Sequence, residues 1–285
     1  DGGVVVDMDT ARIRRANVQL LPNASIQTSE TGMRHRTAER VARQTGYPVI
    51  SVSQSMRIIS LYVDGKRHVL EPSESILASA NQALSALERY KARLDQTSAG
   101  LDSLEIEDLV TVRDVTSVLQ LMEMVRRISA DIDSYVLELG TDGRLLALQV
   151  EELTRGLLAE HGFLLEDYLP EGLDTATVDA RLKWVGSPAL LDLAMVARSM
   201  GLGGIDGQDL DAQVSPRGLR ILSKIPRLPV VTARAVVEQW GSLQGVLGAT
   251  IEELEAVEGV GAQRARTLRD GLSRLAEISV VERYS

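Results

Sequence analysis

The stretch Thr31-Gly32-Met33-Arg34-His35-Arg36-Thr37-Ala38-Glu39-Arg40 decides how the first part of the chain folds, because a flexible glycine leads through Arg-His-Arg into a helix-forming run. Arg34 and Arg36 each offer a rigid fork of donors, which suits phosphate oxygens better than the point charge of lysine. Gly32 allows a tight turn, and free N–H groups at a helix start favour an anion. The stretch predicts a polyphosphate site. Taken alone, an Arg-His-Arg triplet is more often a solvated basic turn.

The residues around this stretch predict an α/β domain. A helix is expected from Thr37 to Thr45, ended by Gly46. Asp64-Gly65 is typical of a hairpin turn leading into residues 68–70. Short β-branched runs predict strands, at residues 4–6, 49–52 and 58–63. The motifs fall at connections between strands and helix, where α/β folds place their ligands.

The middle of the chain predicts packed helices and little chemistry. Apolar residues recur at helical spacing, within residues 75–96, 105–128, 148–158 and 188–200. Residues 74–215 carry a net charge of −14, whereas residues 1–73 carry +3 and residues 216–285 carry +2. The acidic side chains most simply form a solvated face. This region is therefore expected to be a spacer or an oligomer spine, and nucleic acid is not expected along the whole molecule.

The last part of the chain holds a second motif, from Leu254 to Ala265. It resembles a helix-hairpin-helix element, in which the hairpin Gly259-Val260-Gly261 lets backbone N–H groups reach a DNA phosphate. Arg264, Arg266 and Arg269 are candidates for further phosphate contacts. A degenerate copy at residues 222–231 predicts a tandem pair. The structural alternative is a glycine-rich turn between core helices, and nothing in the motif is suited to reading bases.

The composition excludes several classes of protein. The 285 residues include no cysteine, which rules out disulfides, thiolate catalysis and cysteine metal sites. No apolar run has the length needed to span a bilayer, and no signal peptide is expected. A cytoplasmic protein is expected. Aromatic residues make up only 3% of the chain, so the core is expected to consist of aliphatic side chains.

The order of the motifs resembles that of the DisA family of bacterial diadenylate cyclases over the whole chain. The resemblance rests on Asp1-Gly2-Gly3, on Arg34-His35-Arg36 and on the C-terminal hairpins. It implies a partial α/β cyclase domain at residues 1–73, an all-α spine at 74–215 and a tandem helix-hairpin-helix domain at 216–285. Because the first residue is Asp within strand-forming sequence, the N-terminal part of the cyclase domain is expected to be missing.

The resemblance also implies roles for single residues. Asp1 falls where the family binds Mg²⁺ or Mn²⁺ and activates a ribose 3′-hydroxyl, which suits a carboxylate beside a glycine. The ATP-binding positions are Gly2, Leu20, Met33, Arg34, His35, Arg36, Thr37 and Ser53, and Arg34, His35 and Arg36 share the catalytic role with Asp1. Between two arginines, His35 is expected to be neutral and to contact or orient phosphate. Gly3 replaces an alanine of the family and Met33 replaces a threonine, which puts full activity in doubt.

The activity implied is the joining of two ATP into cyclic di-AMP with release of pyrophosphate, at sites between facing subunits of a homo-octamer. Branched, Holliday-junction-like DNA bound at the tail would lower this activity, as a DNA-integrity checkpoint near the bacterial nucleoid. One alternative is a catalytically weak DNA-structure-binding repair scaffold. Another is an oligomeric adaptor that uses the spine alone, for which substitution of Gly259 and Gly261 would leave DNA affinity unchanged.

Overall fold

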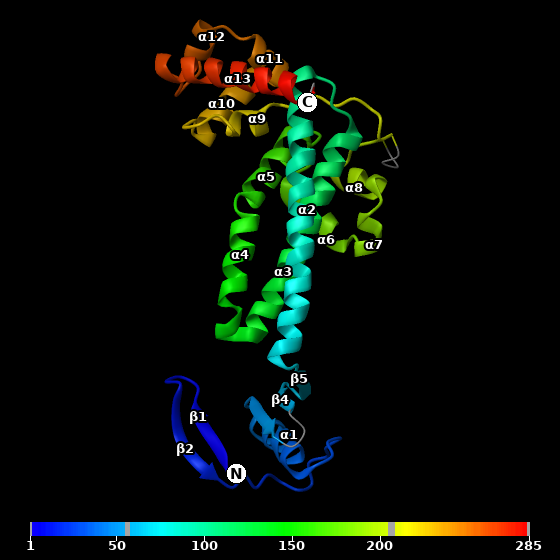
Figure 1. The fold of residues 1–285 in the computed structure, drawn as a ribbon, viewed down its shortest axis with the longest axis vertical. Coiled ribbons are helices and arrows are strands. Elements are labelled where there is room, and N and C mark those ends of the chain that lie inside the picture. Colours follow the sequence, from blue (N-terminus) through cyan, green and yellow to red (C-terminus); the bar gives the residue numbers. More distant parts are fainter. Residues whose placement is uncertain (1, 55–57, 205–208, 284–285) are drawn as a thin grey trace. The chain divides into compact units, whose positions relative to one another are not determined.

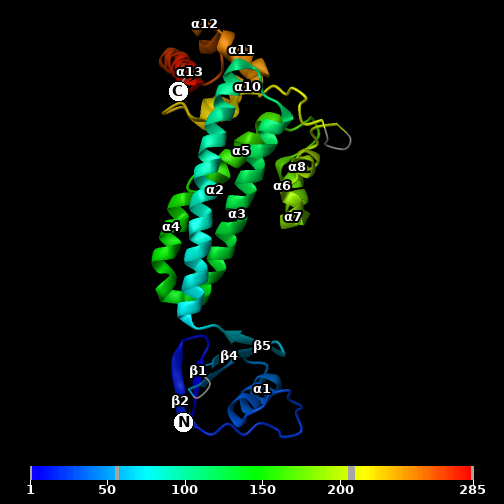
Figure 2. The same cartoon turned by 45° about the vertical axis from the view of Figure 1, so that its right-hand side comes forward.

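A computed structural model describes residues 2–54, 58–204 and 209–283 (Figures 1 and 2). The chain divides into two compact units. The first comprises Asp1–Ala80 with Leu137–Gly143, and the second comprises Asn81–Val136 with Arg144–Ser285.

The first unit holds two small antiparallel sheets. β1 (Gly3–Asp7) pairs with β2 (Arg12–Val18), and a three-stranded sheet has the order β3 (Val49–Ser53), β4 (Ile58–Val63), β5 (Lys66–Leu70). The strands predicted at residues 4–6, 49–52 and 58–63 are confirmed, whereas β2 was not predicted because its three arginines leave it without a β-branched run. Asp64 and Gly65 have φ values of +50° and +72°, so the expected hairpin turn joins β4 to β5.

The helix after the glycine, α1 (Met33–Thr45), begins four residues before the predicted start at Thr37. Gly32 alone, with φ +92°, turns the chain, and the N–H of Arg36 already donates to its carbonyl at 3.1 Å. Arg34, His35 and Arg36 therefore lie inside the first helical turn and not in a loop before it. Gly46 ends the helix in the left-handed region, as expected. Ala38 and Ala42 pack the helix against Tyr62 of β4.

Long helices form the body of the second unit. α2 (Ser73–Glu107), α3 (Val112–Leu139) and α4 (Arg144–Thr154) run side by side (Figures 1 and 2). The predicted helix start at residue 105 is wrong, because α2 continues through Gly100 and the chain turns only at Asp108, where φ is +57°. No described helix combines the length and apolar character that crossing a bilayer requires. Fully buried aliphatic side chains fill the interior: Leu87, Leu94, Leu119, Val125 and Ile132.

Shorter helices follow. A 3₁₀ turn, η1 (Gly140–Gly143), separates α3 from α4 where Asp142-Gly143 predicted an interruption. The predicted helix 148–158 is broken by Gly156, with φ +80°, into α4 and α5 (Leu157–Tyr168). After α6 (Thr175–Trp184), the predicted helix 188–200 divides into α7 (Ser187–Leu190) and α8 (Leu193–Met200), because the Asp192 carboxylate caps α8.

The C-terminal helices form the expected tandem of hairpins. They are α9 (Leu219–Ser223), α10 (Val230–Trp240), α11 (Leu243–Gly248), α12 (Ile251–Glu255) and α13 (Ala262–Arg283). One aliphatic core joins both hairpins and includes Leu222, Ile225, Leu254, Ala265 and Leu268. The observed fold class is therefore the expected one: an α/β part, a helical spine and a tandem helix-hairpin-helix domain.

A buried ion pair attaches the hairpins to the spine. The Arg220 side chain, at the start of α9, is completely buried. Its Nη2 lies 2.7 Å from Oε2 of the equally buried Glu105 of α2, and its Nη1 donates to Ser98 Oγ at 3.1 Å. The Tyr168 hydroxyl donates to Glu105 Oε1 at 2.7 Å. Because an unpaired buried charge is strongly unfavourable, these contacts fix α9 against α2 and α5.

Asp167 of α5 holds the beginning of α9 by a second set of contacts. Its carboxylate accepts the backbone N–H groups of Gly218, Leu219 and Arg220 at 3.0, 2.7 and 2.8 Å. Burial raises the pKa of Asp167 to about 7, in spite of these donors. The helix end is thus capped by a side chain from the spine and not by its own preceding residue, Gly218.

Replacing Arg220 by Met is expected to destabilise the second unit by about 3–5 kcal/mol, because Glu105 is left buried without its cation. Urea unfolding followed by fluorescence of Trp240, which packs on the C-terminal core, measures this. The control is Arg113→Met, which removes an exposed pair with Asp211 and costs about 1 kcal/mol or less. Adding Glu105→Met should restore most of the loss. If Arg220→Met and Arg113→Met lowered the free energy of unfolding equally, the buried pair of Arg220 and Glu105 would not have the stabilising role assigned to it.

Asp167 gives a pH dependence of known sign. Its folded pKa of about 7 exceeds the ordinary value of 3.8, so the folded state binds more protons between these values. Its contribution to the free energy of unfolding is therefore full below about pH 4 and is lost as the pH rises toward 7. Asp167→Asn keeps an acceptor oxygen and removes the titration. Urea unfolding from about pH 4.5 to 7.5 should show the wild type losing stability relative to this variant, with a difference in slope approaching about 1.4 kcal/mol per pH unit. Parallel profiles of stability against pH for the wild type and Asp167→Asn would refute the raised pKa of Asp167.

Candidate functional site

The first turn of α1 presents the predicted anion-binding groups. Arg34 and Arg36 are exposed, and the Met33 side chain is 84% exposed. The first N–H that bonds within the helix is that of Arg36, and no side chain caps Gly32. The N–H groups of Met33 and His35 therefore have no carbonyl acceptor within the helix and lie at the positive end of its dipole. Thr37 is half-buried on the next turn.

His35 differs from its neighbours in being buried. Its side chain and that of Tyr62 are each 2% exposed, and its Nδ1 lies 3.0 Å from the Tyr62 hydroxyl oxygen. Its Nε2 is buried and has no hydrogen-bond partner among the residues that the structure describes. Buried polar atoms almost always have a hydrogen-bond partner, so His35 Nε2 is a candidate for contact with a bound ligand.

The loop before Gly32 is fastened to α1. Arg40 Nε donates to the carbonyl of Ile26 at 2.9 Å, and Arg43 Nη1 donates to that of Gln27 at 2.7 Å. Arg36, Arg40 and Arg43 follow one another at helical spacing, so both contacts come from the face of α1 that carries Arg36. They hold the chain that leads to the turn at Gly32.

The structure brings Gly2, Gly3 and Leu20 together. A Cβ on Gly2 would lie 2.4 Å from the Asn17 Cα, so only glycine fits there. A Cβ on Gly3 would lie 3.2 Å from Leu20 Cδ1, so the alanine that the family has at this position would fit tightly. Asp1 lies outside the described residues. This group adjoins the sheet of β1 and β2, whereas His35 contacts Tyr62 in the sheet of β3, β4 and β5.

Ser53 is buried at the end of β3, opposite Ile58 of β4. It therefore lies in the three-stranded sheet, whereas Gly2 and Leu20 adjoin the ends of β1 and β2. Over residues 2–54, 58–204 and 209–283, no three His, Asp or Glu side chains gather closely enough to hold a metal ion. The described residues do not by themselves fit a divalent cation, and the expected ligand, Asp1, is not among them.

The second hairpin exposes two glycines directly before the start of α13. Gly259 has φ +81°, and neither Gly259 nor Gly261 has an atom within 4 Å of an added Cβ. The first N–H bonded within α13 is that of Ala265, which donates to Gly261 at 3.0 Å, so those of residues 262–264 are available, and that of Gly261 donates to no backbone carbonyl of the described residues. Val260 is buried and its N–H donates to Val257 at 2.9 Å, so its place is in the core.

The three arginines of this hairpin have different contacts. Arg264 Nη1 donates to the Gly259 carbonyl at 2.7 Å, which holds its guanidinium beside the hairpin. Arg266 is exposed one residue beyond the buried Ala265. Arg269 Nη1 donates to the carbonyl of Leu247 at 2.7 Å, at the end of α11. Arg269 therefore links α13 to α11 in addition to any phosphate contact.

The first hairpin repeats this geometry 32 residues earlier. Arg227 occupies the place of Gly259 and has φ +65°. The N–H of Leu228 donates to Ile225 at 3.3 Å, and that of Ala233 donates to Pro229 at 3.0 Å, as the residues 32 positions later do. Pro229 stands where the second hairpin has Gly261 and offers no N–H. The first hairpin thus has one backbone donor fewer.

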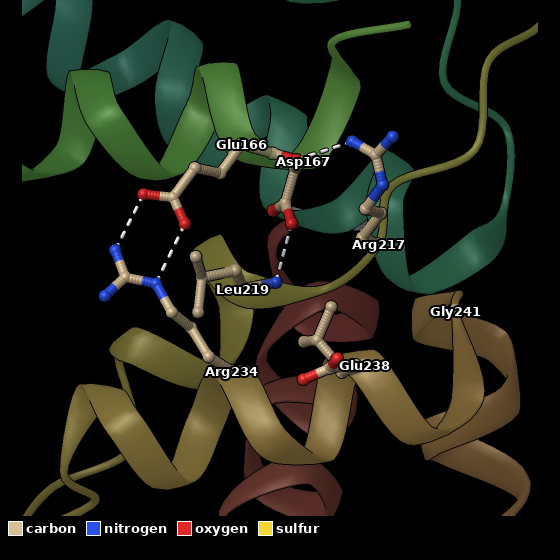
Figure 3. Close-up of a pocket in the computed structure, with 8 residues that line it drawn as sticks. Glu166, Asp167, Arg217, Leu219, Arg234, Glu238 and Gly241 are labelled. Carbon is tan, nitrogen blue, oxygen red and sulfur yellow. Dashed lines mark hydrogen bonds and ion pairs between the residues drawn. The ribbon is translucent and has the colours of Figure 1, made fainter. Parts of the chain in front are cut away.

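A cavity of about 400 Å³ lies where the first hairpin meets α5 (Figure 3). Arg234 of α10 forms a two-point pair with Glu166, with distances of 2.9 Å from Nε and 2.7 Å from Nη2. Arg217 donates to the carbonyls of Glu166 and Leu169 at 2.6 and 2.8 Å. Both guanidinium groups are thus used in joining spine and hairpin. The predicted site residues do not line this cavity.

Sequence reasoning missed the groups behind these sites. Tyr62 was recognised only as part of a strand, Glu105 and Asp167 were among the acidic residues assigned to a solvated face, and Arg220 was given no role. A buried ionisable residue has no local pattern that distinguishes it from an exposed one. The usable signal for Tyr62 was its scarcity, since the chain has only 6 tyrosines and 1 phenylalanine.

Comparison with known proteins covers the whole chain. The family model described as "DisA bacterial checkpoint controller nucleotide-binding" matches residues 1–67, and "DisA bacterial checkpoint controller linker region" matches 70–208. "SAM-like Helix-hairpin-helix tandem" matches residues 219–274.

Relatives of high identity carry one name, DNA integrity scanning protein DisA. That of Acidothermus cellulolyticus is 56% identical over 289 residues, which include all of this chain and 78% of the relative. That of Streptomyces coelicolor is 55% identical and covered to 77%, and that of Parafrankia sp. is 56% identical and covered to 80%. Identity at this level over every residue settles the relationship: the chain belongs to the DisA family.

Proposed function

We propose that this chain is part of a diadenylate cyclase that also binds DNA. The observation that carries the proposal is the first turn of α1, within the segment similar to a DisA nucleotide-binding region, where the exposed Arg34 and Arg36 lie at the positive end of a helix dipole. Charge-assisted bonds from these donors suit the triphosphate of ATP. Leu20, Gly2 and Ser53 remain proposed contacts to the rest of the nucleotide.

The proposed reaction joins two ATP molecules. The 3′-hydroxyl oxygen of each attacks the α-phosphorus of the other, the bond to pyrophosphate breaks, and two pyrophosphates leave with cyclic di-AMP. Two copies of the chain, each presenting one ATP, would face each other within a homo-octamer. Arg34 and Arg36 would neutralise the charge of the leaving group and hold the reactants in line. Asp1 remains the proposed ligand of a divalent cation, Mg²⁺ or Mn²⁺, which would add further positive charge at the phosphates.

The proposed DNA site is the second hairpin. Its available N–H groups at residues 261–264 and the guanidinium groups of Arg264 and Arg266 suit backbone phosphate, which supports recognition of DNA shape and not of sequence. Branched DNA is the proposed ligand, with occupancy lowering cyclase activity as a checkpoint.

A second candidate function is a repair scaffold that binds DNA structures and turns over ATP slowly. Met33 favours it, because this exposed thioether stands at the first helical position and offers no side-chain hydroxyl to a phosphate. Arg34 and Arg36 favour the cyclase.

Formation of cyclic di-AMP by the full-length protein tests the first half of the proposal. Incubation with ATP and Mn²⁺ or Mg²⁺, resolved by chromatography, should give product. The variant Arg34→Ala/Arg36→Ala should lose about 100-fold or more in rate, because charge stabilisation of the leaving group is removed. Asp1→Asn should also lose activity. Arg155→Ala, an exposed arginine of the spine, is the control and should keep the parent rate. If the parent protein forms no cyclic di-AMP, the DNA-binding repair scaffold is the remaining candidate function.

Gly261→Pro tests the hairpin, because Pro229 shows that the same backbone geometry accommodates proline. The variant loses one N–H donor and should bind a four-way DNA junction more weakly, by about 1 kcal/mol or roughly five-fold. Arg266→Ala should lower the slope of log affinity against log salt by about one. Arg155→Ala should leave affinity and slope unchanged. Unaltered junction binding by both hairpin variants would exclude the second hairpin as the DNA site.

A further inference from the structure

The loop at residues 21–32 joins two parts of the proposed nucleotide site. Leu20, directly before the loop, lies against Gly3 of β1, and Arg34 follows the loop in the first turn of α1. The loop itself contains neither helix nor strand. A connection of this length has many conformations of similar energy, so that fixing one of them costs conformational entropy. The contacts that fix the loop therefore help to set where Leu20 and Arg34 stand relative to each other.

Four side chains of α1 bind four residues of this loop. The pairs are Glu39 with Thr28, Arg40 with Ile26, Arg43 with Gln27, and Gln44 with Asn23. Positions 39, 40, 43 and 44 lie on one face of a helix of 3.6 residues per turn. The end of α1 holds the beginning of the loop, and the middle of α1 holds the part that leads to the turn at Gly32. The loop is thus bound along the helix that it precedes.

Glu39 is the centre of this set of contacts. It is buried, and its Oε2 accepts the hydroxyl of Thr28. Its Oε1 lies 2.7 Å from Nη2 of Arg43, whose Nη1 donates to the carbonyl of Gln27 at 2.7 Å. Thr28 Oγ1 in turn accepts the N–H of Glu30 at 3.1 Å. Glu39 therefore holds the loop directly through Thr28 and indirectly by orienting Arg43.

The chemistry of these contacts suits the ordering of a loop. Arg40 and Arg43 donate from guanidinium groups to backbone carbonyls, and Glu39 accepts with a carboxylate. Hydrogen bonds with one charged partner are about twice as strong as those between neutral groups. Together they oppose the entropy of the loop in the protein without ligand.

We propose that these four side chains of α1 are positioning residues that hold the loop in one conformation before a nucleotide binds. They act on the nucleotide through the loop, whose ends adjoin Leu20 and the turn at Gly32. A site whose loop is already ordered binds its ligand without the cost of ordering the loop at that moment. The choice of ATP as the ligand rests on the proposed function, whereas the order of the free loop does not.

The order of the loop can be measured without nucleotide. Hydrogen exchange of the full-length protein, followed by mass spectrometry over residues 21–32, reports on the bonded N–H groups of Asn23 and Glu30. Glu39→Ala and Gln44→Ala should both speed exchange in this segment. Gln44 is exposed, so its replacement leaves the buried part of α1 unchanged. Exchange as slow in both variants as in the parent would overturn the proposal.

Thr45→Ala is the matched control for these variants. Thr45 follows Gln44 on α1, and its hydroxyl donates to the carbonyl of Val41 within the same helix at 2.7 Å. This substitution should leave both the exchange of residues 21–32 and the affinity for nucleotide as in the parent.

The affinity for nucleotide tests the positioning role. The probe is 3′-deoxy-ATP, which lacks the attacking hydroxyl and so binds without reacting, and titration calorimetry measures its Kd. Glu39→Ala should raise this Kd about tenfold, as expected if the loop is ordered in roughly a tenth of the free variant molecules. Gln44→Ala, which removes one neutral hydrogen bond, should raise it by about two- to five-fold. Glu39→Gln keeps an acceptor oxygen for Thr28 and should retain part of the affinity.

Kinetics adds a second measurement of the same role. In the full-length protein, Glu39→Ala should raise the KM for ATP with little change in kcat, because bound ATP restores the order of the loop. A purely structural role would lower the melting temperature of Glu39→Ala and leave both its KM and its Kd as in the parent, which would overturn the positioning role alone. A parent that binds neither ATP nor 3′-deoxy-ATP would overturn the proposed function, and the role of the loop toward ATP with it.

Discussion

The ion pair between Arg220 and Glu105 joins residues 115 positions apart, and both side chains are completely buried. Neither charge could remain in that interior alone, because desolvation would far exceed what packing returns. α2 must therefore extend far enough to carry Glu105 to this place, and α9 must start where Arg220 reaches it. Asp167 adds to the constraint by accepting the N–H groups of the same helix start. The position of the hairpins on the spine follows from these charges.

The α/β part is held by two smaller polar contacts. Arg67 of β5 pairs with Glu30 in the loop before α1, and Tyr62 of β4 contacts His35 in the first turn of α1. Only the contact between Tyr62 and His35 reaches the Arg-His-Arg motif. Arg34 and Arg36 are exposed on either side of His35, which the contact with Tyr62 holds in the interior. Burial of His35 and exposure of Arg34 and Arg36 are thus two parts of one arrangement.

Much of the fold could be predicted from local patterns, and the failures have physical reasons. The runs at residues 49–52 and 58–63 gave strands, and Gly46 and Gly201 ended helices because left-handed residues stop them. Gly100 did not end α2, since a helix fixed by packing tolerates one glycine. The helix after the Arg-His-Arg motif was predicted to start four residues too late, and the site expected at this motif stays a prediction. Tyr62, Asp167 and Arg220 could not be predicted, because their roles come from partners distant in sequence.

The repeated hairpins carry a consequence for the symmetry of whatever they hold. Arg227 and Gly259 share a backbone conformation, so the two hairpins are near copies in shape. Pro229 and Gly261 differ in the one atom that a phosphate would use, a backbone hydrogen. If DNA contacted both hairpins, the first would offer its phosphates one backbone N–H fewer than the second. Such a domain would have a direction along its ligand without contacting a single base.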